Sequence, residues 1–365
     1  MNVVARAFQP VNLHRNRRTR VVRVDPQAPS GGAIAEAASI IRAGGLVAFP
    51  TETVYGLGAN ALDEEAVHSI FTAKERAASD PLIVHIAKTE DLATVAASVS
   101  PIARLLFDRF APGPLTVVLP RSQAVAPSVS AGLATVAVRF PSHAVARALI
   151  ETAGVPIAAP SANRFTRTSA TTAEHVLEDL DGRIDLVLDG GPANAGIEST
   201  VVSIESDTVF VLRAGALTLE AIVAALPSAV RVESEVPGGT HGSPGLLDRH
   251  YAPRKPLTLV RSPAPEGVAH LADEVRRALA AGEVPGILLL AEDESPLSGL
   301  GPLVRARLGR AQELNGVANR LYAAMRELDR SHATALFARS VPPAGLGAAI
   351  NDRLKRAAAR IIDPV

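Results

Sequence analysis

The chain has 365 residues, 47% hydrophobic and only 3% aromatic, so it can fill two cores with mainly aliphatic side chains. It contains no cysteine, which excludes disulfide bonds, cysteine zinc sites and thiol catalysis and suits a reducing, cytoplasmic setting. The 37 basic and 37 acidic residues cancel, which argues against the overall positive field of a dedicated nucleic-acid-binding protein. Because no apolar run reaches the roughly 18 residues of a membrane span, we expect no membrane partner.

The first twenty residues contain five arginines and no acidic residue. Pro10 and the lack of helical periodicity argue against an amphipathic import helix. We therefore expect either a basic, disordered tail over residues 1–20 or a start codon assigned too early.

Helices and strands alternate over residues 21–228, which predicts a single α/β domain with a mixed sheet. Helical periodicity and capping residues predict helices over Ala33–Ala43, Asp63–Lys74, Ser100–Phe110, Ser142–Gly154, from Thr171 or Thr172 to Leu180, and from Thr218 onward. Apolar runs predict strands over Leu46–Phe49, Leu82–Ile86, Leu115–Leu119, Thr135–Arg139, Ile157–Ala159, Ile184–Leu188, Ser199–Ile204 and Val209–Leu212.

Residues 229–255 lack a hydrophobic period and are rich in proline and glycine, so we expect a linker there. A second, smaller α/β unit is predicted over residues 256–365. Its expected strands are Leu257–Val260, Ile287–Ala291 and Ala333–Phe337, and its expected helices are Gly267–Ala281, Gln312–Arg330 and Gly347–Ile361.

The segment from Leu46 to Gly58 combines a buried strand with polar residues that follow it. Pro50 ends the strand, and a polar turn is expected next in place of another core element. Gly56 and Gly58 would let the backbone pass close to a neighbouring element, or to a ligand at the carboxyl end of the strand. Their spacing also fits a dinucleotide-binding fingerprint, but no acidic residue closes a second strand about 20 residues later, so this interpretation is disfavoured.

Other polar residues admit both structural and functional interpretations. Lys74 and Arg76 end a helix, where cations are favourable even without a ligand. Arg139 leaves an apolar strand and requires an anionic partner, either a structural carboxylate or a ligand. His85 in an apolar strand is typical of a core histidine. No Walker, H-E-x-x-H or G-x-S-x-G motif is present, and no acidic cluster indicates a metal site. The collected cations and hydroxyls favour an anionic, phosphorylated substrate.

A series of segments, taken in chain order, closely resembles the Sua5/YrdC family: FPTETVYGLGANAL, KER followed by DPLIVHI, PGPLTVVL, TVAVRFPSH, PIAAPSAN, IEST and VLRAGA. The HYAP sequence of the linker and the second half of the chain resemble the two-domain Sua5 branch. This resemblance covers about Val21 to Ile361. It implies a YrdC-like domain with an open, twisted, mixed sheet, followed by a smaller Rossmann-like α/β domain.

The resemblance also implies an activity, that of an L-threonylcarbamoyladenylate synthase, which is a nucleotidyltransferase. Such enzymes join L-threonine, bicarbonate or CO2, and ATP, and they release pyrophosphate. This reaction is the first step of threonylcarbamoyl adenosine formation in tRNA, and the product passes to a tRNA threonylcarbamoyl transferase complex. Mg2+ would arrive with ATP, so no resident metal is expected.

Matching the family motifs residue by residue gives the expected site. Lys74 and Arg76 would be catalytic, and Arg139 would hold the carboxylate of threonine. The implied ATP-binding set is Lys74, Arg76, Thr116, Ser161, Asn163, Ser169, Arg213 and Tyr251, and the implied threonine-binding set is Thr51, His85, Arg139 and Ser199. Tyr251 lies in the linker, where it could act as a lid. The chain departs from the family around Ser169, where related members often have prolines.

Two alternatives remain. A double-stranded RNA or tRNA-binding module without catalysis would share the fold, but the neutral charge and few aromatic residues argue against tight, stacking-driven RNA binding. A carbamoyl-transfer enzyme acting on carbamoyl phosphate would resemble hydrogenase-maturation proteins, which carry zinc-finger cysteines that this chain lacks.

Overall fold

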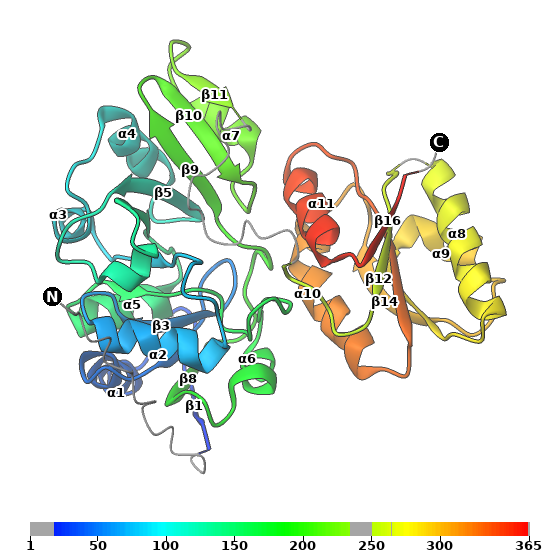
Figure 1. The fold of residues 1–365 in the computed structure, drawn as a ribbon, viewed down its shortest axis with the longest axis horizontal. Coiled ribbons are helices and arrows are strands. Elements are labelled where there is room, and N and C mark those ends of the chain that lie inside the picture. The colour runs from blue at the N-terminus through cyan, green and yellow to red at the C-terminus, as the bar shows by residue number, and fades with distance from the viewer. Residues whose placement is uncertain (1–17, 234–249, 264, 364–365) are drawn as a thin grey trace, which may run out of the picture.

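The computed structural model describes residues 18–233, 250–263 and 265–363. These residues form two α/β domains that lie side by side, with helices α10 (Leu314–Arg330) and α11 (Leu346–Ala357) of the second domain facing the first (Figure 1). Most of the expected linker, residues 234–249, and most of the expected tail, residues 1–17, lie outside the described residues. Among the described helices, none is both long and apolar enough to cross a membrane.

The first domain is built on an 11-stranded sheet with the order β1-β8-β2-β3-β7-β4-β6-β5-β9-β10-β11. Its strands are β1 (Arg20–Arg23), β2 (Val47–Phe49), β3 (Gly56–Asn60), β4 (Ile83–His85), β5 (Leu115–Pro120), β6 (Thr135–Arg139), β7 (Ile157–Ala158), β8 (Leu186–Asp189), β9 (Thr200–Glu205), β10 (Thr208–Arg213) and β11 (Arg231–Glu233). Parallel pairs such as β4–β6 and antiparallel pairs such as β5–β6 both occur. The predicted mixed sheet is therefore confirmed.

Seven α-helices accompany this sheet in the described part of the domain: α1 (Gly31–Arg42), α2 (Glu64–Lys74), α3 (Leu92–Val95), α4 (Pro101–Phe110), α5 (Ala144–Ala153), α6 (Ala173–Leu180) and α7 (Leu219–Ala225). The predicted caps explain where several of them begin. Asp63, Ser100, Thr172 and Thr218 each accept a hydrogen bond from a backbone N–H of the first helical turn. Gly154 ends α5 with a positive φ of 67°, a conformation that glycine adopts without strain.

Both faces of the large sheet are buried. Val47 and Phe49 of β2 pack with α1 and α5 on one face, whereas Ala48 between them belongs to the core that holds α2, α4 and α6. This alternation follows from the two-residue period of a strand. Helices on both sides thus fix the strand ends, where the polar residues of the sequence gather.

One expectation about the segment after Pro50 is wrong. Residues 56–60 are not part of a polar turn but form β3, which pairs antiparallel with β2. A Cβ at Gly58 would lie 2.7 Å from Cε1 of Phe49 and 2.8 Å from Cγ2 of Ile157, so this glycine permits the close approach to a neighbouring element that the sequence suggested. Gly56, by contrast, does border the cavity described below.

The second domain has five parallel strands in the order β14-β13-β15-β12-β16. They are β12 (Leu257–Val260), β13 (Pro285–Leu290), β14 (Val304–Gly309), β15 (Ala335–Arg339) and β16 (Arg360–Ile362). Helices α10 and α11 pack with one hydrophobic cluster, and α8 (Pro265–Ala280) packs with another, beside the short α9 (Glu294–Leu297). The predicted helix to Ile361 is too long, because its last residues form β16 at an edge of the sheet.

Short edge strands, together with the four-residue helices α3 and α9, which we did not predict, account for the other main differences from the expected elements. β11 lies within the expected linker and pairs with β10, and β1 begins at Arg20, inside the expected tail. β14, which we did not predict, is the edge strand that pairs with β13. These strands carry charged residues and are only partly buried, so they lack the apolar run by which a buried strand is recognised.

Candidate active site

In the first domain, the register between neighbouring strands aligns the polar residues that follow or end these strands. His85 of β4 lies opposite Arg139 of β6, and Arg139 lies opposite Thr116 of β5. β9 follows β5 in the sheet, with Thr200 opposite Leu115, and this places Ser199 at the same edge. Residues far apart in the sequence thus form one polar row.

Three residues of this row, His85, Arg139 and Ser199, border a cavity of about 50 Å³. Eight of the twelve predicted site residues line the cavity: Thr51, Arg76, His85, Arg139, Ser161, Ser199, Arg213 and Tyr251. They come from both the predicted ATP-binding and the predicted threonine-binding sets. The structure therefore brings the two sets together at one place.

The other four predicted residues lie behind the cavity wall and hold its lining residues. The Thr116 hydroxyl is 2.8 Å from the Ser199 hydroxyl. Ser169 donates a 2.5 Å hydrogen bond to Oε1 of Glu198. Lys74 Nζ donates to the Ser161 carbonyl at 2.5 Å and to the Asn163 carbonyl.

Lys74 and Arg76 owe their positions to the end of α2. Glu75 adopts a left-handed conformation with φ of 54°, which reverses the chain between the two cations. Burial, together with the charge of Arg76, lowers the pKa of Lys74 well below its usual range. Arg76 is held by Asp80 at 2.8 Å and by the ring of Phe165, whose centroid lies 5.7 Å from the guanidinium carbon.

The predicted threonine-binding residues are buried and pre-arranged. Arg139 Nη2 lies 2.6 Å from Oε1 of Glu52, so the structure supplies one of the anionic partners that the sequence left open. Burial and the neighbouring Arg139 lower the pKa of His85 to about 3, which keeps its imidazole neutral at pH 7. Thr51 Oγ1 donates to the Val54 carbonyl at 2.7 Å, and this bond shapes the turn after β2.

Glu198 is a functional candidate that was not among the predicted site residues. It lines the cavity, as Arg213 does, and its carboxylate is buried. Burial raises the pKa of this carboxyl, but Arg353 and Arg213 outweigh burial and lower it to about 2. A glutamate directly before Ser199 in the IEST segment was the available signal, but its partners come from distant parts of the chain.

Tyr251 lies inside the site in this structure. It is 1% exposed, and its ring centroid is 4.1 Å from that of His250 and 5.8 Å from that of Tyr322 in α10. Its φ of 62° is left-handed, a conformation that costs a non-glycine residue on the order of 1–3 kcal/mol unless packing enforces it. His250 also lines the cavity, and it was not among the predicted site residues although it belongs to the HYAP motif.

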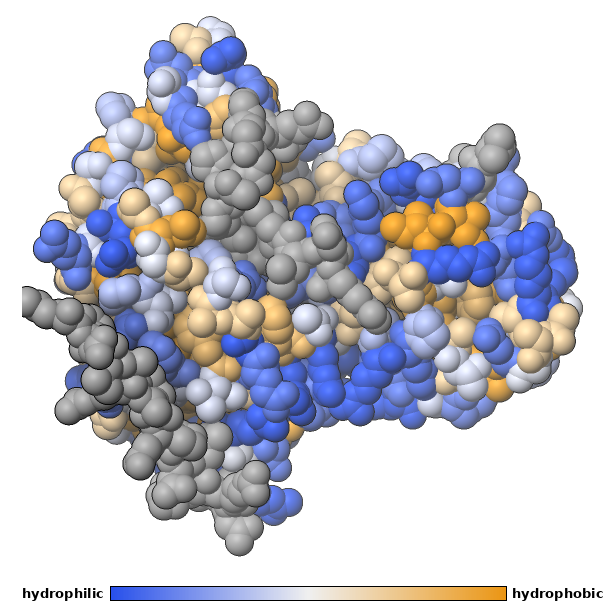
Figure 2. Space-filling view, viewed as in Figure 1, coloured by the Kyte–Doolittle hydropathy of each residue, from blue (hydrophilic) through white to orange (hydrophobic). Residues whose placement is uncertain are grey.

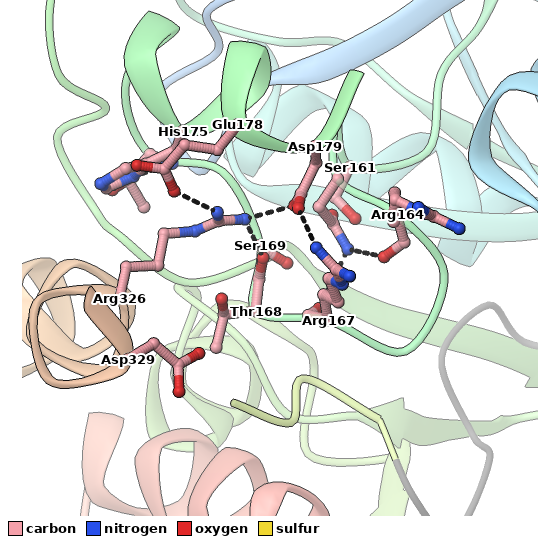
Figure 3. Close-up of polar contacts among 12 residues, drawn as sticks. Ser161, Arg164, Arg167, Thr168, Ser169, His175, Glu178, Asp179, Arg326 and Asp329 are labelled. Atoms are coloured by element: carbon pink, nitrogen blue, oxygen red, sulfur yellow. Dashed lines mark hydrogen bonds and ion pairs between the residues drawn. The ribbon is translucent and has the colours of Figure 1, made fainter. Parts of the chain in front are cut away.

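A second group of contacts joins the domains beside the loop that carries Ser169 (Figure 3). Arg326 of α10 donates to the Thr168 carbonyl at 2.6 Å and pairs with Asp179 at 2.7 Å and with Glu178 at 3.0 Å. Arg167 approaches the other oxygen of Asp179 at 2.9 Å. On the face drawn in Figure 2, hydrophilic side chains predominate along the lower part of the junction between the domains. Polar contacts from the second domain thus fix a loop of the first.

Within residues 18–233, 250–263 and 265–363, no group of three or more histidine, cysteine, aspartate or glutamate side chains could hold a metal ion.

Comparisons with known proteins cover both halves of the chain. A family model described as "Telomere recombination", for the Sua5, YciO and YrdC proteins, matches residues 39–215. A second model, described as "Threonylcarbamoyl-AMP synthase, C-terminal domain", matches residues 217–359. The two matches meet at the start of α7, before the described part of the expected linker.

Relatives resemble the chain over most of its length. A threonylcarbamoyl-AMP synthase of Bacillus subtilis is 43% identical over 337 residues, covering 92% of this chain and 93% of the relative. A protein of the same name from Pyrococcus abyssi is 41% identical over 325 residues, covering 88% of this chain and 92% of the relative. The crystal structure of P. abyssi Sua5 complexed with L-threonine superposes with a TM-score of 0.87 at 39% identity, covering 95% of this chain and 100% of that one. The chain therefore belongs to the Sua5/YrdC family, in its two-domain Sua5 form.

Proposed function

We propose that this protein synthesises L-threonylcarbamoyladenylate from L-threonine, bicarbonate or CO2, and ATP, with release of pyrophosphate. The observation that carries this proposal is the convergence of the two predicted residue sets on a single cavity. Relatives named threonylcarbamoyl-AMP synthase, and a similar structure that holds L-threonine, support the same activity. Neither the site nor the comparisons favour the alternative of an RNA-binding module.

The threonine end of the site is assigned to Arg139, Thr51, His85 and Ser199. The Arg139 guanidinium would bind the threonine carboxylate through charge-assisted hydrogen bonds, and its pairing with Glu52 fixes its orientation in advance. Neutral His85 borders the same space and avoids placing a second positive charge beside Arg139. The Thr51 and Ser199 hydroxyls would bind the polar groups of threonine.

The nucleotide end is assigned to Lys74, Arg76 and Arg213, which would neutralise the triphosphate, with Thr116, Ser161, Asn163, Ser169 and Tyr251 shaping the pocket. Mg2+ would enter as MgATP, a substrate complex.

In the reaction, the threonine amine adds to CO2 and loses a proton, which gives a carbamate. A carbamate oxygen then attacks the α-phosphorus, and the bond to pyrophosphate breaks. Positioning and charge stabilisation suffice for such phosphoryl chemistry.

Tyr251 would act as a lid. The cavity of about 50 Å³ is far smaller than the roughly 300–1,000 Å³ of typical ligand sites, so ATP and threonine can enter only after buried side chains withdraw. Tyr251 is held by side-chain contacts in a left-handed conformation, which favours its release when those contacts are exchanged for a substrate. A closing lid would also protect the carbamate and the adenylate from water.

The cellular role follows from the product. The adenylate would pass to a tRNA threonylcarbamoyl transferase complex, and we place the protein in the cytoplasm, where ATP and tRNA meet.

Pyrophosphate release by the purified protein tests the proposal. Release should require ATP, L-threonine and bicarbonate together, and omission of any one should abolish it. Release that is indifferent to threonine would overturn the assignment. RNA binding that is tight and falls steeply with salt, in a protein without this activity, would instead support the RNA-binding alternative.

A further inference from the structure

The second domain inserts a buried arginine into the junction beside the cavity. Arg353 of α11 is 0% exposed and is among the largest fully buried side chains of the described residues. Ile350 and Leu354, its neighbours on the same helix, are buried in the hydrophobic cluster that contains Tyr251. α11 therefore holds the guanidinium at the boundary between the two domains.

Each contact that this guanidinium makes outside the second domain is with a predicted site residue or with the chain neighbour of one. Arg353 Nε donates to Oε2 of Glu198 at 2.8 Å, and Glu198 precedes Ser199. Nη2 donates to the Ala214 carbonyl at 3.0 Å, directly after Arg213. The guanidinium carbon lies 4.9 Å from the centroid of the Tyr251 ring, within the range of a cation–π interaction.

Glu198 is the centre of this arrangement. Its Oε1 accepts from Ser169 at 2.5 Å, and both its oxygens lie near the hydroxyl of Tyr322, at 3.1 and 3.0 Å. A buried carboxylate is stable only when such partners replace water. The titratable and charged groups that face it come from four parts of the chain: Arg353 of α11, Tyr322 of α10, Arg213 of β10, and the linker residues His250 and Tyr251.

We infer that Arg353 is a positioning residue of the active site supplied by the second domain: its guanidinium fixes the Glu198 carboxylate between Ser169 and Arg213 and holds the Tyr251 ring at the cavity. This inference rests on the proposed function for its kinetic readout. It also gives the second domain a role in the site, because one side chain links the IEST segment, the end of β10 and the lid.

Loss of the guanidinium has two separate consequences. Glu198 loses the strongest of the interactions that keep it ionised, so its pKa rises and the carboxyl takes up a proton at a higher pH than in the native protein. Tyr251 loses its cation–π partner, so the lid is held less firmly. Arg353→Lys keeps the charge near Glu198 but loses the fork of donors that reaches Glu198 and Ala214 together.

The test compares Arg353→Met, Arg353→Lys and Glu198→Gln with a control that perturbs the same domain. Arg339→Met is that control, since Arg339 forms a buried 2.8 Å ion pair with Asp293 inside the second domain. All variants are assayed for pyrophosphate release between pH 5 and 9, below the unfolding temperature of each. L-threonine binding is measured in parallel by calorimetry.

Arg353→Met should lower kcat/KM for ATP on the order of 100-fold, since misplacement of a site by about 1 Å has that effect, and its pH profile should gain an acidic limb that the native profile lacks. Arg353→Lys should remove the acidic limb and recover part of the rate. Combining Arg353→Met with Glu198→Gln should cost less than the two separate losses together, because the two residues act as one unit.

Three results would overturn the inference: an Arg353→Met protein that behaves like Arg339→Met, a pH profile without a new limb, or additive effects in the double variant. Failure of the proposed function is distinguishable, since the native protein would then release no pyrophosphate. In that case weakened L-threonine binding in Arg353→Met but not in Arg339→Met still supports positioning by Arg353, and equal binding refutes it. Should Arg353→Met fail to fold, Arg353→Lys and Glu198→Gln decide the question.

Discussion

Replacement of Lys74 by methionine separates the chemical role of this side chain from its structural one. Methionine matches the buried aliphatic chain as far as Cε, with sulfur in place of Cδ, and removes the ammonium group. Lys74 is 1% exposed, and its ammonium donates to the carbonyls of Ser161 and Asn163, so it fixes the turn after β7. Its depressed pKa reflects mainly burial and then the charge of Arg76. The native protein therefore tolerates an unfavourable position for a cation at this point.

The expected change in stability is small because two effects oppose each other. The two lost hydrogen bonds contribute about 1.5–3 kcal/mol each when the donor is charged. Removing the ammonium also removes the cost of burying a charge, which is several kcal/mol and acts in the opposite direction. The free energy of unfolding should therefore change by no more than about 2 kcal/mol. The catalytic effect should be much larger: loss of one group that stabilises developing charge lowers kcat by about 100- to 1,000-fold, or roughly 2.7–4 kcal/mol.

Pyrophosphate release with all three substrates, beside urea unfolding of the same samples, measures both quantities. Lys88→Met is the matched control, because Lys88 is exposed and lies away from the cavity, and it should behave as the native protein does. An Lys74→Met protein that keeps its rate within about threefold would refute the assignment of Lys74 to the nucleotide site.

Three further predictions concern other parts of the first domain. Arg139→Met should raise KM for L-threonine by about 10- to 100-fold, since a hydrogen bond to a charged group contributes about 1.5–3 kcal/mol, and steady-state kinetics measures this. The pKa of His85 falls from 6.5 to about 3 on folding, so its stabilisation is complete above pH 6.5 and is lost as the pH falls toward 3. Denaturant unfolding should show a loss of about 1.4 kcal/mol per pH unit in this window, and His85→Gln should make the dependence shallower. Gly58→Ala should lower the free energy of unfolding by about 1–3 kcal/mol, because its Cβ would clash with Phe49 and Ile157.

Each of these predictions has a control within the chain. Arg147→Met, at a partly exposed arginine of α5, should leave KM for threonine unchanged, and an equal rise in both variants would contradict the role of Arg139. His68→Gln, on the exposed side of α2, should keep the native pH dependence of unfolding. Gly316→Ala, in α10 with open space around the glycine, should stabilise the protein or leave it unchanged, in contrast to Gly58→Ala.

Several features could be predicted from the sequence because they depend on neighbours along the chain. Asp63, Ser100 and Thr218 cap helices that begin where their side chains can reach the first backbone N–H groups. The strand over Thr135–Arg139 has the predicted bounds, because a short apolar run with polar residues at its ends marks a buried strand locally. β3 could not be predicted, because Gly56 and Gly58 favour turns locally, and only the tertiary structure shows that Phe49 and Ile157 leave no room for a Cβ at Gly58.

For the residues of the site, too, some features depend on neighbours along the chain and others on distant contacts. The sequence determined which side chains follow the strand ends, because local hydrophobic patterns locate those ends, and the family motifs supplied their assignments. Only the tertiary structure decided that Glu198 meets Arg353, 155 residues further along the chain, and that Tyr251 lies inside the cavity. Such contacts depend on the packing of α11 against the first domain. No local pattern encodes that geometry, since an isolated buried charge becomes stable only when a distant partner arrives.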